Sequence, residues 1–321
     1  MNKIFDAHCD TIYELNNKNM GLLKNSIHLD AERMSKYDTY IQVFAAFVDK
    51  EEITVSPMNH CLKLMDKYHT ELEKSGGMLT AIETAQQLED AAKRGGAYSI
   101  LSIEGAEALD GNLSALRMYY KMGVRLITLT WNYANELCDG ITESRGGGLT
   151  DFGRKAVAMM EDMGILIDVS HLSERGFWDV AECTKYPFTA SHSCAKALCG
   201  NIRNLTDEQI KTVAERNGCI GVNFYPEFLS ERKQCDISDI VRHIKYMIEL
   251  GAENAIGLGS DFDGVECLPQ GINGAENMKD IISALRDAGL SQAVTDKIAF
   301  GNFYRLFYET LSRGQIYNNF C

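Results

Sequence analysis

The chain has 321 residues, 45% of them hydrophobic and only 4 of them proline, and a formal net charge of −13. Its length is within the range of α/β barrels and it has no low-complexity linker, which favours one domain over residues 1–321. The acidic balance disfavours nucleic acid as a partner, because phosphate contacts need clustered Lys and Arg, and no apolar stretch approaches the about 20 residues of a membrane anchor.

Strand-like and helix-like segments alternate along the chain. Short apolar runs predict strands at Ile4–Ala7, Ile41–Val48, Tyr98–Ile103, Arg125–Leu129, Leu166–Val169, Phe188–Ala190, Cys219–Asn223 and Ala255–Gly259. Helical periodicity predicts helices at Met58–Lys74, Ala85–Arg94, Leu113–Met122, Phe152–Met163, Glu174–Thr184, Asp207–Asn217, Ile237–Leu250, Met278–Ala288 and Asn302–Leu311. Continuously apolar strands are typical of a parallel sheet with helices on both faces. Eight of them with intervening helices predict an α/β fold, a (β/α)8 TIM-like barrel.

Imidazoles and carboxylates follow five of the predicted strands. They are His8 with Asp10, then Glu104, His171, His192 and Asp261. Active sites of such barrels form at the C-terminal ends of the strands, so these side chains should meet there. Histidine and carboxylate together suit Zn²⁺ or a similar first-row ion. A polar turn would also explain His8 and Asp10, and loop capping would explain Asp261 or Asp263.

The other histidines and the cysteines give weaker signals. We interpret His28, His60, His69 and His243 as residues at the surface or behind the ligands. The 10 cysteines show no CxxC spacing, which favours free thiols in a reducing compartment over a disulfide framework. No basic-then-apolar signal segment opens the chain, because Asp6, His8 and Asp10 interrupt it. We therefore expect a cytoplasmic protein.

Motifs spread along nearly the whole chain carry a family resemblance. They are Asp-Ala-His-Cys-Asp at 6–10, Gln-Val-Phe-Ala at 42–45, Ser-Ile-Glu-Gly at 102–105, Gly-Leu-Thr-Asp-Phe-Gly at 148–153, Ile-Asp-Val-Ser-His at 167–171, Ala-Ser-His-Ser at 190–193, Arg-Asn-Leu at 203–205 and Gly-Ser-Asp-Phe-Asp-Gly at 259–264. In this order they resemble the membrane (renal) dipeptidase family, binuclear zinc peptidases on an amidohydrolase-type barrel. The His-x-Asp element alone is weak, because many metallohydrolases contain it, whereas the ordered set is specific.

The resemblance implies a role for each matching position. One zinc ion would be held by His8 and Asp10 and the other by His171 and His192, with Glu104 bridging the two. Asp261 matches the carboxylate that handles the proton of the attacking water. Arg203 matches the arginine that binds the free carboxylate of the substrate, with Tyr225 assisting it. The implied activity is hydrolysis of dipeptides by a metal-bridged hydroxide, with tolerance of a D-residue at the C-terminal position, and the implied assembly is a homodimer.

One position departs from the family pattern. Animal members have a histidine directly after Leu-Thr-Leu-Thr that helps hold the substrate and its tetrahedral intermediate, whereas this chain has Trp131. An indole offers one N–H donor and no titrating nitrogen. Trp131 could donate to an oxyanion or form a wall of the pocket, with Asn132 as an alternative donor. If the loop has a different shape, neither residue contacts the substrate.

Two other functions use the same residues. An amidohydrolase acting on N-acyl amino acids or cyclic amides would need the same metals. A barrel that binds metal but has lost catalysis would act by association instead.

Overall fold

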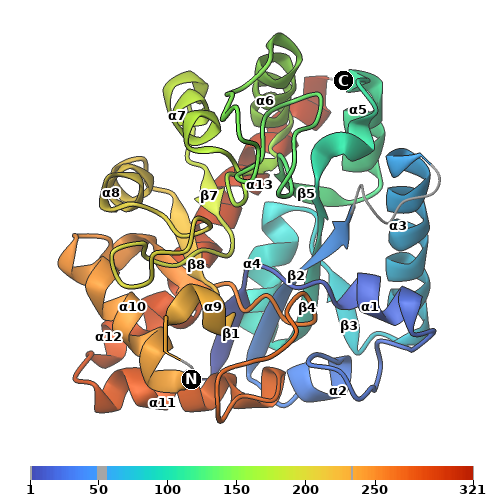
Figure 1. The fold of residues 1–321 in the computed structure, drawn as a ribbon. Coiled ribbons are helices and arrows are strands. Elements are labelled where there is room, and N and C mark those ends of the chain that lie inside the picture. Colours follow the sequence, from blue (N-terminus) through green and yellow to red (C-terminus); the bar gives the residue numbers. More distant parts are fainter. Residues whose placement is uncertain (1, 49–55, 233, 321) are drawn as a thin grey trace.

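The computed structural model describes residues 2–48, 56–232 and 234–320, and its centre is a parallel β-barrel (Figure 1). The barrel strands are β1 (Lys3–Asp6), β2 (Thr39–Phe47), β4 (Gly96–Glu104), β5 (Val124–Thr128), β6 (Leu166–Asp168), β7 (Thr189–Ala190), β8 (Cys219–Val222) and β9 (Ile256–Leu258). Hydrogen bonds join them in the order β2-β1-β9-β8-β7-β6-β5-β4, and pairing of β2 with β4 closes the ring. The predicted (β/α)8 barrel is confirmed.

A ninth strand, β3 (Leu79–Ala81), was not predicted. It pairs with β4 at Ala97–Ser99, whereas β5 joins the same edge of β4 only from Leu101 onwards. β3 therefore extends the sheet at one edge of β4 and is not one of the eight barrel strands.

Helices surround the barrel. They are α1 (Thr11–Asn17), α2 (Ala31–Met34), α3 (Pro57–Lys74), α4 (Ala85–Arg94), α5 (Leu113–Lys121), α6 (Asp151–Met163), α7 (Glu174–Cys183), α8 (Asp207–Glu215), α9 (Pro226–Leu229), α10 (Ile237–Glu249), α11 (Met278–Asp287), α12 (Gln292–Asp296) and α13 (Asn302–Phe320). All predicted helices are present, and only α13 differs much, because it continues nine residues beyond the predicted end at Leu311. The short helices α1, α2, α9 and α12 were not predicted.

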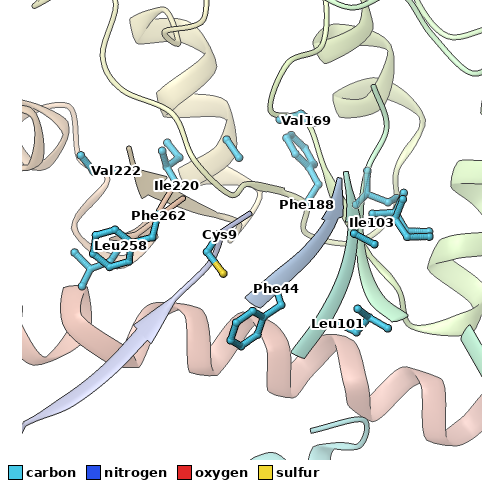
Figure 2. Packing of buried hydrophobic residues seen from close by; sticks show 14 of the residues in the cluster. Cys9, Phe44, Leu101, Ile103, Val169, Phe188, Ile220, Val222, Leu258 and Phe262 are labelled. Atoms are coloured by element: carbon cyan, nitrogen blue, oxygen red, sulfur yellow. The ribbon is translucent and has the colours of Figure 1, made fainter. Parts of the chain in front are cut away.

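Two apolar layers hold this arrangement together. The outer layer lies between strands and helices (Figure 2), where Phe44 of β2 packs against Tyr68 of α3 with ring centroids 6.1 Å apart. The inner layer fills the barrel, and α13 contributes Phe303 and Phe307, whose rings stack on Phe5 at 5.7 and 5.1 Å. A side chain at Gly257 of β9 would collide with Phe303, because its Cβ would lie 2.3 Å from that ring. Because these aromatic rings fill one end of the barrel, buried polar side chains can gather only at the opposite end.

The cysteines are free thiols, as expected from the sequence, where the structure describes them. Among the described residues no cysteine forms a disulfide, and seven of the free thiols are buried: Cys9, Cys61, Cys138, Cys194, Cys199, Cys219 and Cys235. The part of the chain that the structure describes also holds no helix with the length and apolarity of a membrane span.

Candidate metal centre and active site

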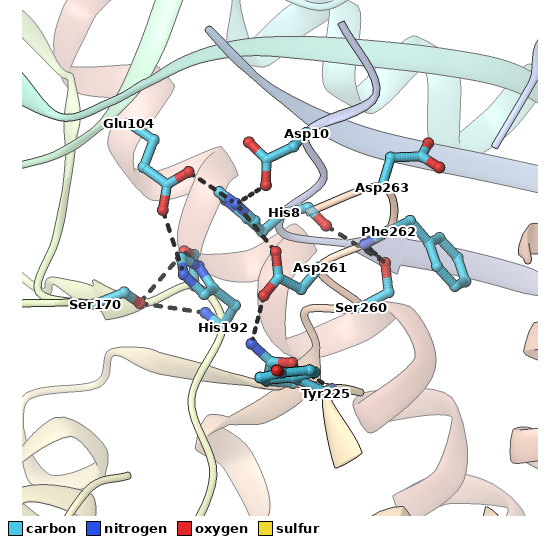
Figure 3. Close-up of polar contacts among 12 residues, drawn as sticks. His8, Asp10, Glu104, Ser170, His192, Tyr225, Ser260, Asp261, Phe262 and Asp263 are labelled. Atoms are coloured by element: carbon cyan, nitrogen blue, oxygen red, sulfur yellow. Dashed lines mark hydrogen bonds and ion pairs between the residues drawn. The ribbon is translucent and has the colours of Figure 1, made fainter. Parts of the chain in front are cut away.

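The C-terminal ends of five strands bring the predicted ligands into one buried cluster (Figure 3). His8 and Asp10 follow β1, and Asp10 is also the residue before α1. Glu104 is the last residue of β4. His171, His192 and Asp261 follow β6, β7 and β9. The structure therefore assembles all six side chains that the sequence singled out.

His8 is at the centre of the first half of the cluster. Its Nε2 lies 3.3 Å from Asp10 Oδ2, 3.3 Å from Glu104 Oε2 and 3.7 Å from Asp261 Oδ1. The ligand atoms of His8, Asp10 and Asp261 all lie within 4.8 Å of one another. The other oxygen of Asp10 is buried and has no hydrogen-bond partner among the described residues. This set of oxygens and one nitrogen could hold a divalent cation.

The second half of the cluster faces the other oxygen of Glu104. Glu104 Oε1 lies 3.0 Å from His171 Nε2 and 3.5 Å from His192 Nε2, whereas its Oε2 faces His8. One carboxylate thus presents its two oxygens to two different groups of ligands. This is the geometry that a bridging ligand between two cations requires.

The hydrogen bonds of the two imidazoles indicate that a cation belongs between them. His171 Nδ1 lies 2.8 Å from Asn132 Oδ1, an amide oxygen that only accepts, so the ring proton is on Nδ1. His192 Nδ1 lies 2.7 Å from the hydroxyl of Ser191. Because that hydroxyl donates to Asp168, its oxygen accepts from His192 Nδ1–H. Both Nε2 atoms therefore carry lone pairs, and they face each other at 2.8 Å. A metal ion converts this repulsion into coordination.

Burial and neighbouring charges adjust the protonation of the cluster. Burial lowers the pKa values of His171 and His192 well below the usual range, which keeps both imidazoles neutral as ligands must be. Burial alone would lower the pKa of His8, but the carboxylates of Glu104 and Asp10 raise it well above the usual range. Burial raises the pKa of Asp10 to about 6 and that of Asp261 to about 7.

Asp261 and Asp263, both candidates from one motif, have different surroundings. Asp261 accepts a hydrogen bond from Asn223 Nδ2 at 2.8 Å and faces the cluster. Asp263 accepts from the Thr11 hydroxyl at 2.6 Å and from the His28 backbone N–H at 2.7 Å, so it holds two loops together. The backbone is left-handed at both positions, with φ +60° at Asp261 and +68° at Asp263, so it does not distinguish them. Strain of this kind, about 1–3 kcal/mol, is typical of functional sites.

The cluster forms the floor of a cavity of about 740 Å³, and Trp131 and Asn132 line its wall. The Trp131 ring contacts Phe47 edge-on at 5.3 Å between centroids. Gly140 lets the loop after β5 fold back on itself, because a Cβ there would lie 2.3 Å from the Asn132 carbonyl oxygen. Both residues thus face the cavity, and their contact with a substrate stays a prediction. Asn132 accepts a hydrogen bond from His171, a contact that no pattern in the sequence indicated.

Arg203 and Tyr225 both contact the ring of Phe228. The buried Arg203 guanidinium donates to the His192 carbonyl at 3.2 Å and lies 5.4 Å over the Phe228 ring. Its Nε has no hydrogen-bond partner among the described residues. Arg203 borders a small cavity of about 30 Å³ that also reaches His171. Tyr225 lines the main cavity directly.

Sequence reasoning missed the residues that hold the ligands in place. Asp168, Ser191 and Asn223 are fully buried. Ser191 contacts His192 and Asn223 contacts Asp261, whereas Asp168 accepts a hydrogen bond from Ser191. The only signal was a polar side chain inside an apolar segment. His28 was interpreted as a residue at the surface or behind the ligands, and it lies on the wall of the main cavity.

The fold and the cluster together define a class: a metal-dependent hydrolase on a (β/α)8 barrel. Residues 1–315 match the membrane dipeptidase family, peptidase family M19. The chain belongs to this family, as the motifs indicated, and is a hydrolase of a family of metallo-dipeptidases.

Solved structures and a curated relative agree with this assignment. The crystal structure of dipeptidase AC, a metallopeptidase of family M19, superposes with a TM-score of 0.88 at 28% identity and covers 97% of this chain and 99% of that one. A metallopeptidase from Rhodobacter sphaeroides, liganded with a phosphinate mimic of the dipeptide L-Ala-D-Ala, gives a TM-score of 0.87 at 27% identity and covers 96% and 99%. Dipeptidase aclJ of Aspergillus oryzae is 36% identical over 212 residues, which are 65% of this chain and 50% of that protein.

Proposed function

We propose that the protein is a zinc-dependent dipeptidase with two zinc ions per chain bridged by Glu104. The observation that carries the proposal is the pair of Nε2 lone pairs of His171 and His192, which face each other beside one oxygen of Glu104. His8 and Asp10 would hold the first ion and His171 and His192 the second. Imidazole and carboxylate donors are the ligands that Zn²⁺ takes in catalytic sites.

Bound divalent cations would supply the chemistry that is common to two-metal hydrolytic sites. Two divalent cations lower the pKa of a shared water and polarise the carbonyl of the bond to be broken. The residues of the chain then position the reactants and move the protons.

Asp261 is the group we assign to proton transfer. Its carboxylate faces the cluster, and Asn223 fixes its orientation through one oxygen. With the other oxygen Asp261 takes the proton of the attacking water and passes it to the leaving amine.

The substrate contacts come from the wall of the main cavity and from Arg203, which borders the small cavity beside His171. Arg203 binds the free carboxylate of the dipeptide, because a planar guanidinium matches both of its oxygens, and Tyr225 contacts the same Phe228 ring. Trp131 lies over the substrate. The phosphinate mimic of L-Ala-D-Ala in the Rhodobacter sphaeroides relative supports a substrate with a D-residue at the C-terminal position.

A substrate panel combined with metal analysis tests the proposal. We expect two zinc-class ions per chain, loss of turnover with a chelator, and hydrolysis of L-Ala-D-Ala and L-Ala-L-Ala. N-acetylated versions of the same dipeptides should be poor substrates. Equal turnover of the acetylated compounds would instead assign the barrel to another amidohydrolase activity. Absence of turnover in the zinc-loaded protein would identify a metal-binding barrel without catalysis.

A further inference from the structure

Two buried aspartates lie beneath the metal cluster in matching positions. Asp6 ends β1 and Asp168 ends β6, and both are completely buried. Each accepts two hydrogen bonds from one serine beyond a neighbouring strand. Ser260 gives Asp6 its backbone N–H at 2.8 Å and its hydroxyl at 2.5 Å. Ser191 gives Asp168 the same pair at 2.8 and 2.5 Å. The catalytic roles proposed above use neither aspartate.

The Asp168 carboxylate is saturated with donors. Besides the two bonds from Ser191, it accepts from the Ser170 backbone N–H at 3.0 Å and from the Thr128 hydroxyl at 2.7 Å. A carboxylate with four donors acts only as an acceptor. The Ser191 proton is therefore directed to Asp168.

This fixes what the Ser191 oxygen can do for His192. A hydroxyl has one proton, and that of Ser191 is already donated to Asp168, so its oxygen accepts from His192 Nδ1 at 2.7 Å. The Ser170 hydroxyl lies 3.5 Å from the Ser191 oxygen, too far to compete. Ser260 contacts the His8 carbonyl at 3.4 Å and the Phe262 N–H at 3.3 Å, and none of its hydrogen bonds among the described residues reaches an imidazole.

We infer that Asp168 and Ser191 form a relay that holds the His192 proton on Nδ1 and directs the Nε2 lone pair to the metal position. Ser191 is thus a positioning residue, and this role rests on the two-metal site proposed above. Metal-bound histidines commonly donate their second N–H directly to a carboxylate or carbonyl. Here a serine oxygen stands between the ring and the carboxylate. The Asp6–Ser260 pair has the same bonds without a histidine, and so provides an internal control.

Ser191→Ala and Ser260→Ala separate the relay from the loss of a buried hydroxyl. The first measurement is the ¹⁵N NMR spectrum of the histidine side chains in metal-free protein, at a pH where His192 is neutral. The second is zinc affinity, measured in competition with a chelator of known affinity. We expect Ser191→Ala to lose the single Nδ1–H form of His192 and to bind one of the two ions about 10–100-fold more weakly. Ser260→Ala should change neither measurement.

Several outcomes would overturn the relay. One is a wild-type His192 without its proton on Nδ1, which needs no variant and so decides the matter even if Ser191→Ala does not fold. Others are unchanged zinc affinity in Ser191→Ala and an equal loss in Ser260→Ala. If the wild type bound no metal, the two-metal proposal would fail, and the NMR measurement on metal-free protein would still decide whether the relay exists.

Discussion

Asp261 and Asp263 are two positions apart, yet of the two only Asp261 faces the cluster of candidate ligands. Asp263 is tied to Thr11 and His28, whereas Asp261 has one oxygen on Asn223 and the other directed at His8. A carboxylate in such a buried cluster gains a proton easily, since burial raises the pKa of Asp261 to about 7. This balance suits a group that accepts a proton and then releases it.

Replacing Asp261 by asparagine keeps the shape and removes the base. We expect Asp261→Asn to lower kcat by about 10²–10⁴-fold while both metals stay bound. Steady-state kinetics and metal analysis of the same preparation test this. Near-normal turnover would show that Asp261 is only a structural residue of its loop.

Arg203 is assigned to the free carboxylate of the substrate, so its loss should affect binding more than chemistry. We expect Arg203→Ala to raise KM by an amount equivalent to about 1.5–3 kcal/mol. Amidation of the substrate's C-terminus should harm the wild type similarly and the variant hardly at all. If amidation harmed both proteins equally, Arg203 would have no contact with that carboxylate.

Trp131 is the residue at which this chain departs from the animal family members. Trp131→Phe keeps a ring against Phe47 but deletes the N–H donor. If the indole donates to the oxyanion, kcat should fall by the equivalent of about 2.7–4 kcal/mol, and this is the result we expect. A change confined to KM would instead identify Trp131 as a packing wall. Trp178→Phe, on the outside of α7, is the matched control and should leave both constants unchanged.

At the scale of elements, α10 connects two loops of the site through one buried histidine. His243 Nδ1 accepts from the Ala195 N–H at 3.0 Å, three residues beyond His192. Its Nε2 donates to the Leu229 carbonyl at 2.9 Å, at the end of the helix that follows Tyr225. The bond that Nδ1 accepts needs a neutral ring, and burial lowers the pKa of His243 to about 4.

This histidine should make the protein sensitive to acid. Between pH 6.5 and about 4, His243 is protonated in the unfolded chain but stays neutral in the folded chain. The free energy of unfolding therefore falls as the pH falls through this range. The full effect is about 3 kcal/mol. His243→Gln does not titrate, so the loss of unfolding free energy of the metal-free variant from pH 7 to pH 4 should be smaller by about that amount. Urea titrations of both metal-free proteins measure the free energy of unfolding at each pH. If it fell equally with pH in the wild type and in His243→Gln, His243 would not be the source of the acid sensitivity.

The strands and helices that could be predicted from the sequence are those with a clear apolar run or a clear helical period. Strands such as β2 and β4 have nine residues each, most of them apolar, and helices such as α4 and α6 have enough turns to show a period. α9 has only four residues, too few to show a helical period. β3 is as short as β6 and β9, which were predicted, but Thr80 interrupts its apolar run. The metal ligands could be predicted because each follows a strand. Ser191 could not be assigned a role, because its partner Asp168 belongs to another strand and their approach depends on the pairing of β6 with β7.

At the scale of the whole molecule, the two ends of the barrel differ in the side chains that fill them. The aromatic rings of Phe5, Phe303 and Phe307 fill one end, and the ionisable cluster fills the other. Loss of packing at the closed end should therefore reduce stability without disturbing the ligands.

Phe303→Ala tests this separation. We expect it to lower the free energy of unfolding by about 3–5 kcal/mol, while the metal content of the folded protein stays that of the wild type. Tyr308→Ala, on the exposed side of α13, should change stability by at most about 0.5 kcal/mol. Denaturant titrations and metal analysis provide the comparison. Metal loss in Phe303→Ala under native conditions would show that the two ends are coupled.

The pairing of β1 with β9 has a consequence for how the enzyme is made. His8 and Asp10 leave the ribosome before most of the barrel, and their strand acquires its second neighbour only when β9 has been translated. The ring cannot close before then, and Phe303 and Phe307 emerge later still. The cluster can thus assemble only after β9 has been translated, and until then the nascent chain carries His8 and Asp10 without Asp261 and without a closed barrel.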